Sequence, residues 1–197
     1  MDIITKQSAK LHIGCGRNIL PEWINLDCVA LPGVDVVFDL DTCAEHGFPF
    51  PDDSFDMILA SHVLEHIKNP LPLLQELHRV ARPDAKAVFA VPYGANDDAF
   101  EDPTHVRQYF LNSFGYFSQP FYWRADYGYR GDWQPEQIIL AISAEQYAGE
   151  LAEDIMEDIM TLRNVVLEMT VELRAVKPLR EAKKELQQAP EIRYQFV

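Results

Sequence analysis

The sequence predicts an α/β fold: a mostly parallel β-sheet with an antiparallel last strand, followed by a helical C-terminal extension. Three observations lead to this prediction. Short, apolar, β-rich runs recur through the first half, a glycine-containing turn separates two further runs near residue 130, and glycine and proline become rare from about residue 144. We therefore expect one domain over residues 1–143 and a helical extension over residues 144–197.

Five runs in the first half have the composition of buried strands. Each ends near Gly, Asp, Ser or Pro, and together they occupy residues 10–14, 23–27, 35–39, 55–61 and 87–93. Strands that are covered by helices on both faces form such continuous apolar runs, whereas strands with one wet face alternate. These runs therefore predict a parallel sheet.

One amphipathic helix is predicted between the fourth and fifth runs, over residues 69–83. Apolar residues recur there at every third position and Pro83 ends the pattern. The earlier connections, residues 17–24 and 28–34, are too short for a full helical crossover, so the first helix is expected to shrink to a turn or two. Residues 119–143 predict an antiparallel hairpin around the turn YRGDW.

The C-terminal segment shows a heptad-like pattern. Its apolar residues are spaced alternately by four and three, at Ile155, Ile159, Leu162, Val166, Met169, Leu173 and Val176. This spacing predicts one long helix. The helix could pack on its own domain, form a short antiparallel helical hairpin, or provide the seam of a homodimer.

The charge balance restricts the class of ligand. With 31 acidic and 17 basic residues the formal net charge is −14, which disfavours a nucleic-acid partner and favours small polar, neutral or cationic ligands. Three cysteines without a C-x-x-C pair suit a reducing compartment. No apolar run approaches the length that spans a bilayer, so a cytoplasmic protein without a membrane partner is expected.

A glycine turn and two acidic residues point to one ligand site. Gly14 and Gly16 flank Cys15 where the chain leaves the first strand, and Asp27 and Asp39 end the second and third strands. Glycines let a ligand approach the backbone closely, and a carboxylate at a strand end can accept hydrogen bonds from ribose hydroxyls. Either acid alone could equally serve to begin a turn.

These motifs resemble those of the class I S-adenosylmethionine-dependent methyltransferases. The similarity extends over residues 10–143, through LHIGCG, INLD, FDL, FPFPDDSFDMILASHVLEHI and LLQELHRVARPDAKAVFAVP, of which the fourth block is the most specific. The resemblance implies a Rossmann-like, seven-stranded sheet whose last strand is antiparallel, S-adenosylmethionine as cofactor, and methyl transfer to a nucleophile.

The resemblance also assigns site residues. It implies that the cofactor's amino-acid end contacts Gly14, Cys15 and Gly16, its ribose Asp27, its adenine Asp39 and Leu40, and its methionine portion Ser61 and His62. The region after the fifth strand would form the acceptor site. The acceptor is expected to be a small or carbohydrate-like molecule that is methylated at oxygen rather than nitrogen.

Methylation of a hydroxyl needs a proton acceptor, and a neutral histidine suits this role. His105 in DPTHVRQYF is the first candidate and His66 the second. Alternatively, His105 braces its loop against Asp102. These two residues alone offer too few ligands for a divalent ion, so no metal site is predicted.

Two further readings stay open. His62, Glu65 and His66 have the H-x-x-E-H spacing of a zinc hydrolase, which would require both histidines on a helix and a third ligand. A non-catalytic module that binds the cofactor without acceptor chemistry would carry the same glycine turn and acids.

Overall fold

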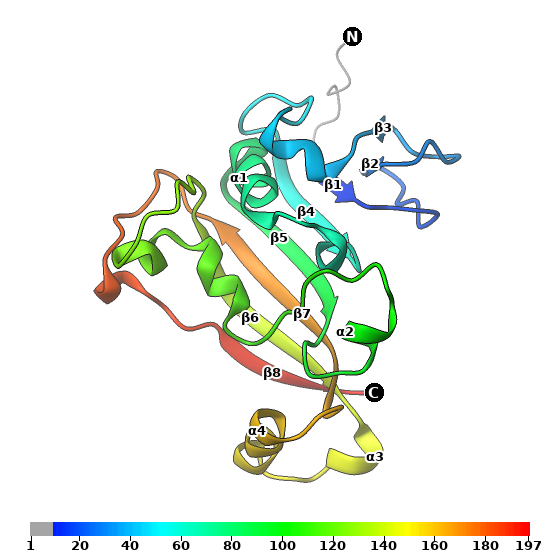
Figure 1. Ribbon diagram of the computed structural model, residues 1–197, viewed down its shortest axis with the longest axis vertical. Coiled ribbons are helices and arrows are strands. Elements are labelled where there is room, and N and C mark those ends of the chain that lie inside the picture. The colour runs from blue at the N-terminus through cyan, green and yellow to red at the C-terminus, as the bar shows by residue number, and fades with distance from the viewer. Residues whose placement is uncertain (1–9) are drawn as a thin grey trace.

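The computed structural model describes residues 10–197, so the first nine residues of the expected 1–143 domain lie outside it. Within this range, eight strands form one sheet in the order β3-β2-β1-β4-β5-β7-β6-β8 (Figure 1). The strands are β1 (Lys10–Ile13), β2 (Ile24–Asp27), β3 (Val36–Val37), β4 (Phe55–Ser61), β5 (Ala81–Pro92), β6 (Trp133–Ile142), β7 (Val166–Ala175) and β8 (Glu191–Phe196).

The pairing of the strands confirms the expected mixed sheet. Strands β3, β2, β1, β4 and β5 pair in parallel, and β7 is antiparallel to both of its neighbours, β5 and β6. Strand β8, which the sequence did not predict, pairs in parallel with β6 at the edge of the sheet. The five parallel strands place their carboxyl ends along one edge, where ligands bind in open α/β sheets.

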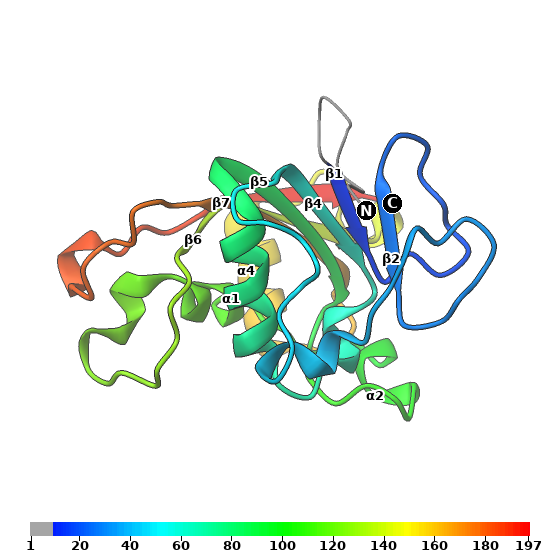
Figure 2. The same ribbon diagram turned by 90° about the horizontal axis from the view of Figure 1, so that it is seen from above.

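Four α-helices accompany the sheet in the described range: α1 (Pro70–Val80), α2 (Asp98–Glu101), α3 (Ala144–Tyr147) and α4 (Ala152–Thr161). The expected helix between the fourth and fifth strands is α1, which lies against one face of the sheet (Figure 2). Its buried face includes Leu73, Leu74 and Leu77, and the Trp133 indole N–H donates to the Leu74 carbonyl oxygen at 2.9 Å.

The two short connections contain no helix, so even the expected remnant of a turn or two is absent. The side chain of Asn25, on β2, instead holds the first connection, residues 17–24, in place. Its Oδ1 accepts a hydrogen bond from the Leu20 N–H at 2.9 Å, and its Nδ2 donates to the Leu20 carbonyl at 3.0 Å. The loop after β1 is thereby tied to β2, which keeps the glycine turn beside the strand ends.

The predicted long C-terminal helix is wrong. Helix α4 ends at Thr161, and the following apolar residues belong to β7, which lies between β5 and β6. Met169, Val171 and Leu173 are buried in β7 at every second position, the period of a strand. The expected boundary at residue 143 therefore divides a single sheet, and the heptad seam for a homodimer does not exist.

The predicted hairpin over residues 119–143 is also wrong in its pairing. Residues Gln119–Trp123 form a 3₁₀ helix, and the antiparallel partner of β6 is β7. Figure 1 places α4 at the opposite end of the molecule from β1–β3, away from the two short connections that lack a helix. Among the described residues, no helix is long and apolar enough to cross a membrane.

Candidate active site

A cavity of about 300 Å³ opens at the carboxyl ends of β1, β2 and β4, and is called here the strand-end cavity. It is lined by Gly14, Asp27, Cys28, Asp39, Leu40, Asp41, His62, Val63, His66 and Ile67. Five of the eight residues predicted to bind the cofactor lie in this wall, together with one of the two candidate bases. The volume falls in the range of roughly 300–1,000 Å³ that is usual for small-molecule sites.

The glycine turn shapes one wall of this cavity. Gly14 has a φ of +60°, and a Cβ atom at this position would lie 2.3 Å from Cγ2 of Val63. Both the backbone conformation and the close packing therefore require glycine here. Gly16, also at positive φ, does not line the cavity, but its N–H donates to Asp27 Oδ2 at 2.7 Å.

Asp27 is held by the backbone and faces the cavity. Only 9% of its surface is exposed, and its two carboxylate oxygens accept hydrogen bonds from the N–H groups of Gly16 and Val29 at 2.7 and 2.9 Å. Each oxygen retains a second lone pair. A fixed carboxylate with two free lone pairs can accept hydrogen bonds from both hydroxyls of a bound diol.

The third strand supplies the other polar wall. Asp39 Oδ1 accepts the Asp41 N–H at 3.0 Å, which starts the 3₁₀ helix Leu40–Ala44, and Asp41 Oδ1 accepts the Lys68 N–H at 2.9 Å. These bonds link the end of β3 to the segment after β4. Between them, Leu40 and Ile67 present apolar surface suited to a planar ring.

Three predicted cofactor residues lie outside the cavity wall. Cys15 is buried, and this burial raises the pKa of its thiol; Gly16 acts through Asp27; and Ser61 is exposed at the end of β4.

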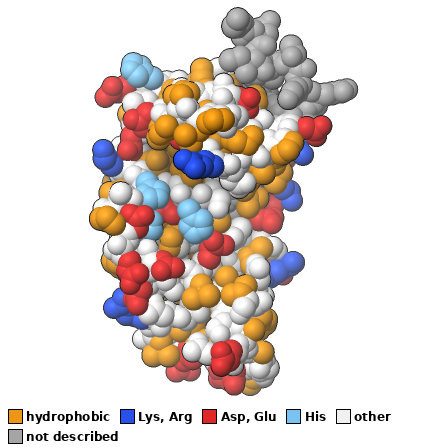
Figure 3. Space-filling view, turned by 90° about the vertical axis from the view of Figure 1, so that its right-hand side faces the viewer, with side chains coloured by type: hydrophobic (Ala, Val, Ile, Leu, Met, Phe, Trp, Pro, Cys, Tyr) orange, Lys and Arg blue, Asp and Glu red, His pale blue; other side chains and the backbone are white. Residues whose placement is uncertain are grey.

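A second cavity of about 640 Å³, called here the acidic recess, adjoins the first through His62. Its lining residues are His62, Pro92, Asp98, Glu101, Asp102, Pro103, His105, Leu167 and Glu168. The wall contains four carboxylates and, among the residues described, no lysine or arginine. On the side of the molecule that carries α2, histidine side chains lie beside acidic ones (Figure 3). The recess therefore disfavours an anionic ligand.

His62 forms the partition between the two cavities. Its φ of +54° is in the left-handed region, which is uncommon for a non-glycine residue. The ring Nε2 lies 2.8 Å from Glu168 Oε2, and Nδ1 lies 3.4 Å from Glu65 Oε1. Leu64–His66 forms a single 3₁₀ turn. The zinc-hydrolase reading requires His62 and His66 on one α-helix, and they are not on one.

His66 and His105 meet at the same place, with ring centroids 4.8 Å apart. Hydrogen bonds from Thr104 lower the pKa of Asp102, so its carboxylate is an acceptor. The Thr104 hydroxyl donates to Asp102 Oδ1 at 2.6 Å and consequently accepts from His66 Nδ1–H at 3.0 Å. This assigns the proton of neutral His66 to Nδ1 and leaves a lone pair on Nε2.

His105 is oriented differently. Its side chain is 8% exposed, and Nε2 lies 3.9 Å from Asp102 Oδ2 and 4.0 Å from Glu65 Oε1. At these distances Asp102 makes no direct hydrogen bond to the ring, so the expected bracing contact is at most electrostatic. The other ring nitrogen, Nδ1, is buried without a hydrogen-bond partner among the described residues.

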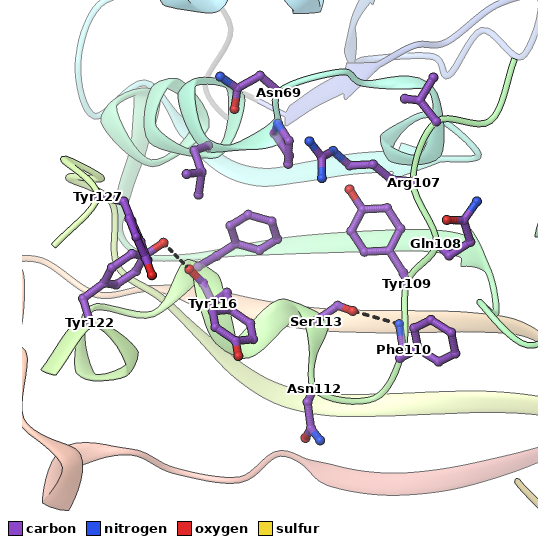
Figure 4. A pocket seen from close by; sticks show the side chains of 14 residues that line it. Asn69, Arg107, Gln108, Tyr109, Phe110, Asn112, Ser113, Tyr116, Tyr122 and Tyr127 are labelled. Carbon is purple, nitrogen blue, oxygen red and sulfur yellow. Dashed lines mark hydrogen bonds between the residues drawn. The ribbon is translucent and has the colours of Figure 1, made fainter. Parts of the chain in front are cut away.

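A third cavity, of about 580 Å³, is aromatic and lies between the start of α1 and residues 106–127 (Figure 4). Tyr109, Phe110 and Tyr116 line it, and the Tyr122 hydroxyl donates to the Tyr116 carbonyl at 2.7 Å. The Arg107 guanidinium in its wall already donates to the carbonyls of Ile67 and Lys68. Within the described residues, this cavity shares no lining residue with the other two.

Two acidic residues at the centre of the site were not predicted in this role. Glu65 was noted only as part of H-x-x-E-H, yet it is 1% exposed and lies against His62 and His105. Glu168 comes from β7, which the sequence analysis assigned to a helix, so nothing suggested that it lies 2.8 Å from His62.

Comparisons with known proteins identify the family and the fold. A family model described as a methyltransferase domain matches residues 6–149. Ajmaline N-methyltransferase of Rauvolfia serpentina is 30% identical over 82 residues, which are 40% of this chain and 28% of that protein. The chain thus spans less than a third of the curated relative.

Two solved structures share the fold. The YcgJ protein of Bacillus subtilis superimposes with a TM-score of 0.52 at 16% identity, over 86% of this chain and 92% of that one. A SAM-dependent methyltransferase from Archaeoglobus fulgidus gives a TM-score of 0.52 at 17% identity, over 86% and 87% of the two chains.

Proposed function

Because this chain belongs to the class I S-adenosylmethionine-dependent methyltransferases, we propose that it transfers a methyl group to a hydroxyl of a small, neutral, carbohydrate-like acceptor. The observation that carries the proposal is the junction of the two cavities at His62. One cavity has the chemistry of a nucleoside site, and the other is lined by carboxylates that accept hydrogen bonds from hydroxyl groups.

The strand-end cavity fits S-adenosylmethionine in two respects. Asp27 offers lone pairs to a ribose diol, and Leu40 and Ile67 offer apolar surface to the adenine. When bound, the cofactor supplies an electrophilic methyl group. The chain's own contribution is to position the two reactants and to accept the hydroxyl proton.

His66 is the residue we assign as the base. It lines the strand-end cavity, and its Nε2 lone pair is free because Nδ1 donates to Thr104. His105, the first candidate from the sequence, keeps its unpartnered nitrogen buried and turns the other toward two carboxylates. We therefore give His105 the role of positioning His66, which its ring contacts edge to face.

Cofactor binding can be tested through Asp27. Calorimetry with S-adenosylmethionine and with its demethylated product is expected to show binding by the wild type, and about 10- to 100-fold weaker binding by Asp27→Asn. The expected loss follows from hydrogen bonds to a charged group, which contribute about 1.5–3 kcal/mol.

Asp35→Asn is the matched control for this experiment. Asp35 also accepts a backbone N–H, from Asn25 at 2.8 Å, but it lies outside the cavity wall. This variant should bind the cofactor like the wild type. Wild-type protein that binds neither compound would refute the proposed function, whereas normal binding by Asp27→Asn would refute only the ribose assignment.

A cationic amine is the second candidate acceptor, because four carboxylates surround the recess. The two candidates predict different results in an acceptor panel that measures the demethylated product. Neutral polyols should be methylated if the main proposal holds, and small amines if the alternative holds. Phosphorylated compounds should be inactive in both cases, and turnover of these alone would exclude the recess as the acceptor site.

A further inference from the structure

Glu65 is buried in an unusual environment. It is 1% exposed, and neither carboxylate oxygen accepts a hydrogen bond from any described residue. A buried carboxylate without a partner is costly, and native structures rarely leave one. The groups that face it are imidazoles: His62 Nδ1 at 3.4 Å and His105 Nε2 at 4.0 Å.

We propose that Glu65, His66 and His105 form a binding site for a divalent transition-metal ion such as Zn²⁺. One donor atom from each of these three side chains lies within 4.8 Å of the others. Ligand atoms lie about 2.0–2.2 Å from bound zinc, so donors around one ion are roughly 3.5 Å apart, and modest side-chain rotations close the difference. The ion would give the buried, unpartnered carboxylate of Glu65 a partner.

The surroundings of the cluster fit this role. Ligating histidines usually donate their second ring N–H to an oxygen, and His66 Nδ1 does so toward Thr104, whose hydroxyl in turn contacts Asp102. Two imidazoles and one carboxylate suit Zn²⁺, Co²⁺ or Ni²⁺ rather than Mg²⁺ or Ca²⁺, which prefer oxygen ligands. This site differs from the H-x-x-E-H reading, because its second histidine is His105 and Glu65 is a ligand.

The proposed ion and the proton of the acceptor hydroxyl would both use the lone pair on His66 Nε2. An ion bound to His66 Nε2 prevents this atom from accepting a proton, so Zn²⁺ should inhibit methyl transfer. The inhibition rests on the proposed function, whereas the binding of the ion does not.

Calorimetry on chelator-treated, cofactor-free protein tests the site directly. We expect one Zn²⁺ per chain, no comparable binding of Mg²⁺, and a visible spectrum of four-coordinate Co²⁺ on titration with that ion. Glu65→Gln and His105→Gln should each weaken zinc binding at least about 100-fold, since even outer-shell partners of ligands change affinity about 10- to 100-fold. His46→Gln, an exposed histidine outside all three cavities, should bind zinc normally.

The outcomes separate the two proposals. Absence of zinc binding by the wild type, or unchanged binding by both Glu65→Gln and His105→Gln, would overturn the metal site. Circular dichroism of each variant checks its folding. Zinc should raise the melting temperature of the wild type but not that of a variant that has lost a ligand. Methyl transfer that accelerates with Zn²⁺ would support the site and remove His66 from the role of base.

Discussion

Replacing His66 with glutamine is expected to lower the turnover number for methyl transfer by about 10²- to 10⁴-fold, the usual contribution of a positioned general base. The Nε2 lone pair of His66 is available because Thr104 accepts the proton on Nδ1. Glutamine retains hydrogen-bonding capacity but offers no comparable base. Steady-state rates on the best acceptor of the panel, measured with chelator present, give the turnover number.

His105→Gln provides the comparison for this prediction. Because His105 contacts His66 edge to face and its own free nitrogen is buried, its replacement should cost less in turnover than that of His66. Cofactor affinity, measured by calorimetry, should change little in His105→Gln, since His105 lies outside the strand-end cavity. A larger loss of turnover in His105→Gln than in His66→Gln would instead identify His105 as the base.

The first half of the fold was predictable because its signals are local. Buried parallel strands are continuous apolar runs, so β1 to β4 and α1 fall within a few residues of the predicted ranges, whereas β5 begins at Ala81, earlier than the predicted run over residues 87–93. The strand ends then define the cavity, and Gly14, Asp27 and Asp39 lie in its wall. The carboxyl ends of parallel strands share one edge, which makes such a site readable from sequence.

The C-terminal half was not predictable in the same way. The spacing from Ile155 to Val176 fits a helix, but the alternating pattern from Met169 to Ala175 fits a strand equally well. The strand forms because this segment pairs with β5 on one side and with β6 on the other. Asn164, at a φ of +60°, interrupts the chain between α4 and β7. Hydrophobic periodicity alone cannot decide between helix and strand here, because the two strands that pair with this segment are far away in sequence.

The centre of the site depends on the same long-range contacts. His105 lies on the loop after β5 and contacts His66, which follows β4. Glu168 contacts His62 although the two are 106 positions apart in sequence. Only the residue types were visible in the sequence, as histidines near acids. Which ring nitrogen keeps a lone pair follows from Thr104 and Asp102. The bond between these two residues is local, but the contact of Thr104 with His66 spans 38 positions of sequence.

Asp132→Asn is expected to lower the free energy of unfolding by about 3 kcal/mol. Asp132 is 0% exposed, and its carboxylate accepts hydrogen bonds from Arg180 Nε and Nη2 at 2.9 and 2.7 Å and from the Gln119 N–H at 3.1 Å. Removing one partner of a buried pair typically costs about 3–5 kcal/mol, because the other charge stays uncompensated. The lower end applies here, since the Arg180 side chain retains 19% exposure.

The same carboxylate joins three segments, because Arg180 follows β7, Gln119 begins a 3₁₀ helix, and Asp132 itself precedes β6. Thermal unfolding should therefore show a melting temperature lower by roughly 6–12 °C for Asp132→Asn. Asp126→Asn is the matched control: Asp126 and Arg130 form a similar two-bonded pair, but both are exposed, and surface pairs contribute little. Equal melting temperatures for the two variants would mean that the Asp132–Arg180 pair does not hold the C-terminal strands to the sheet.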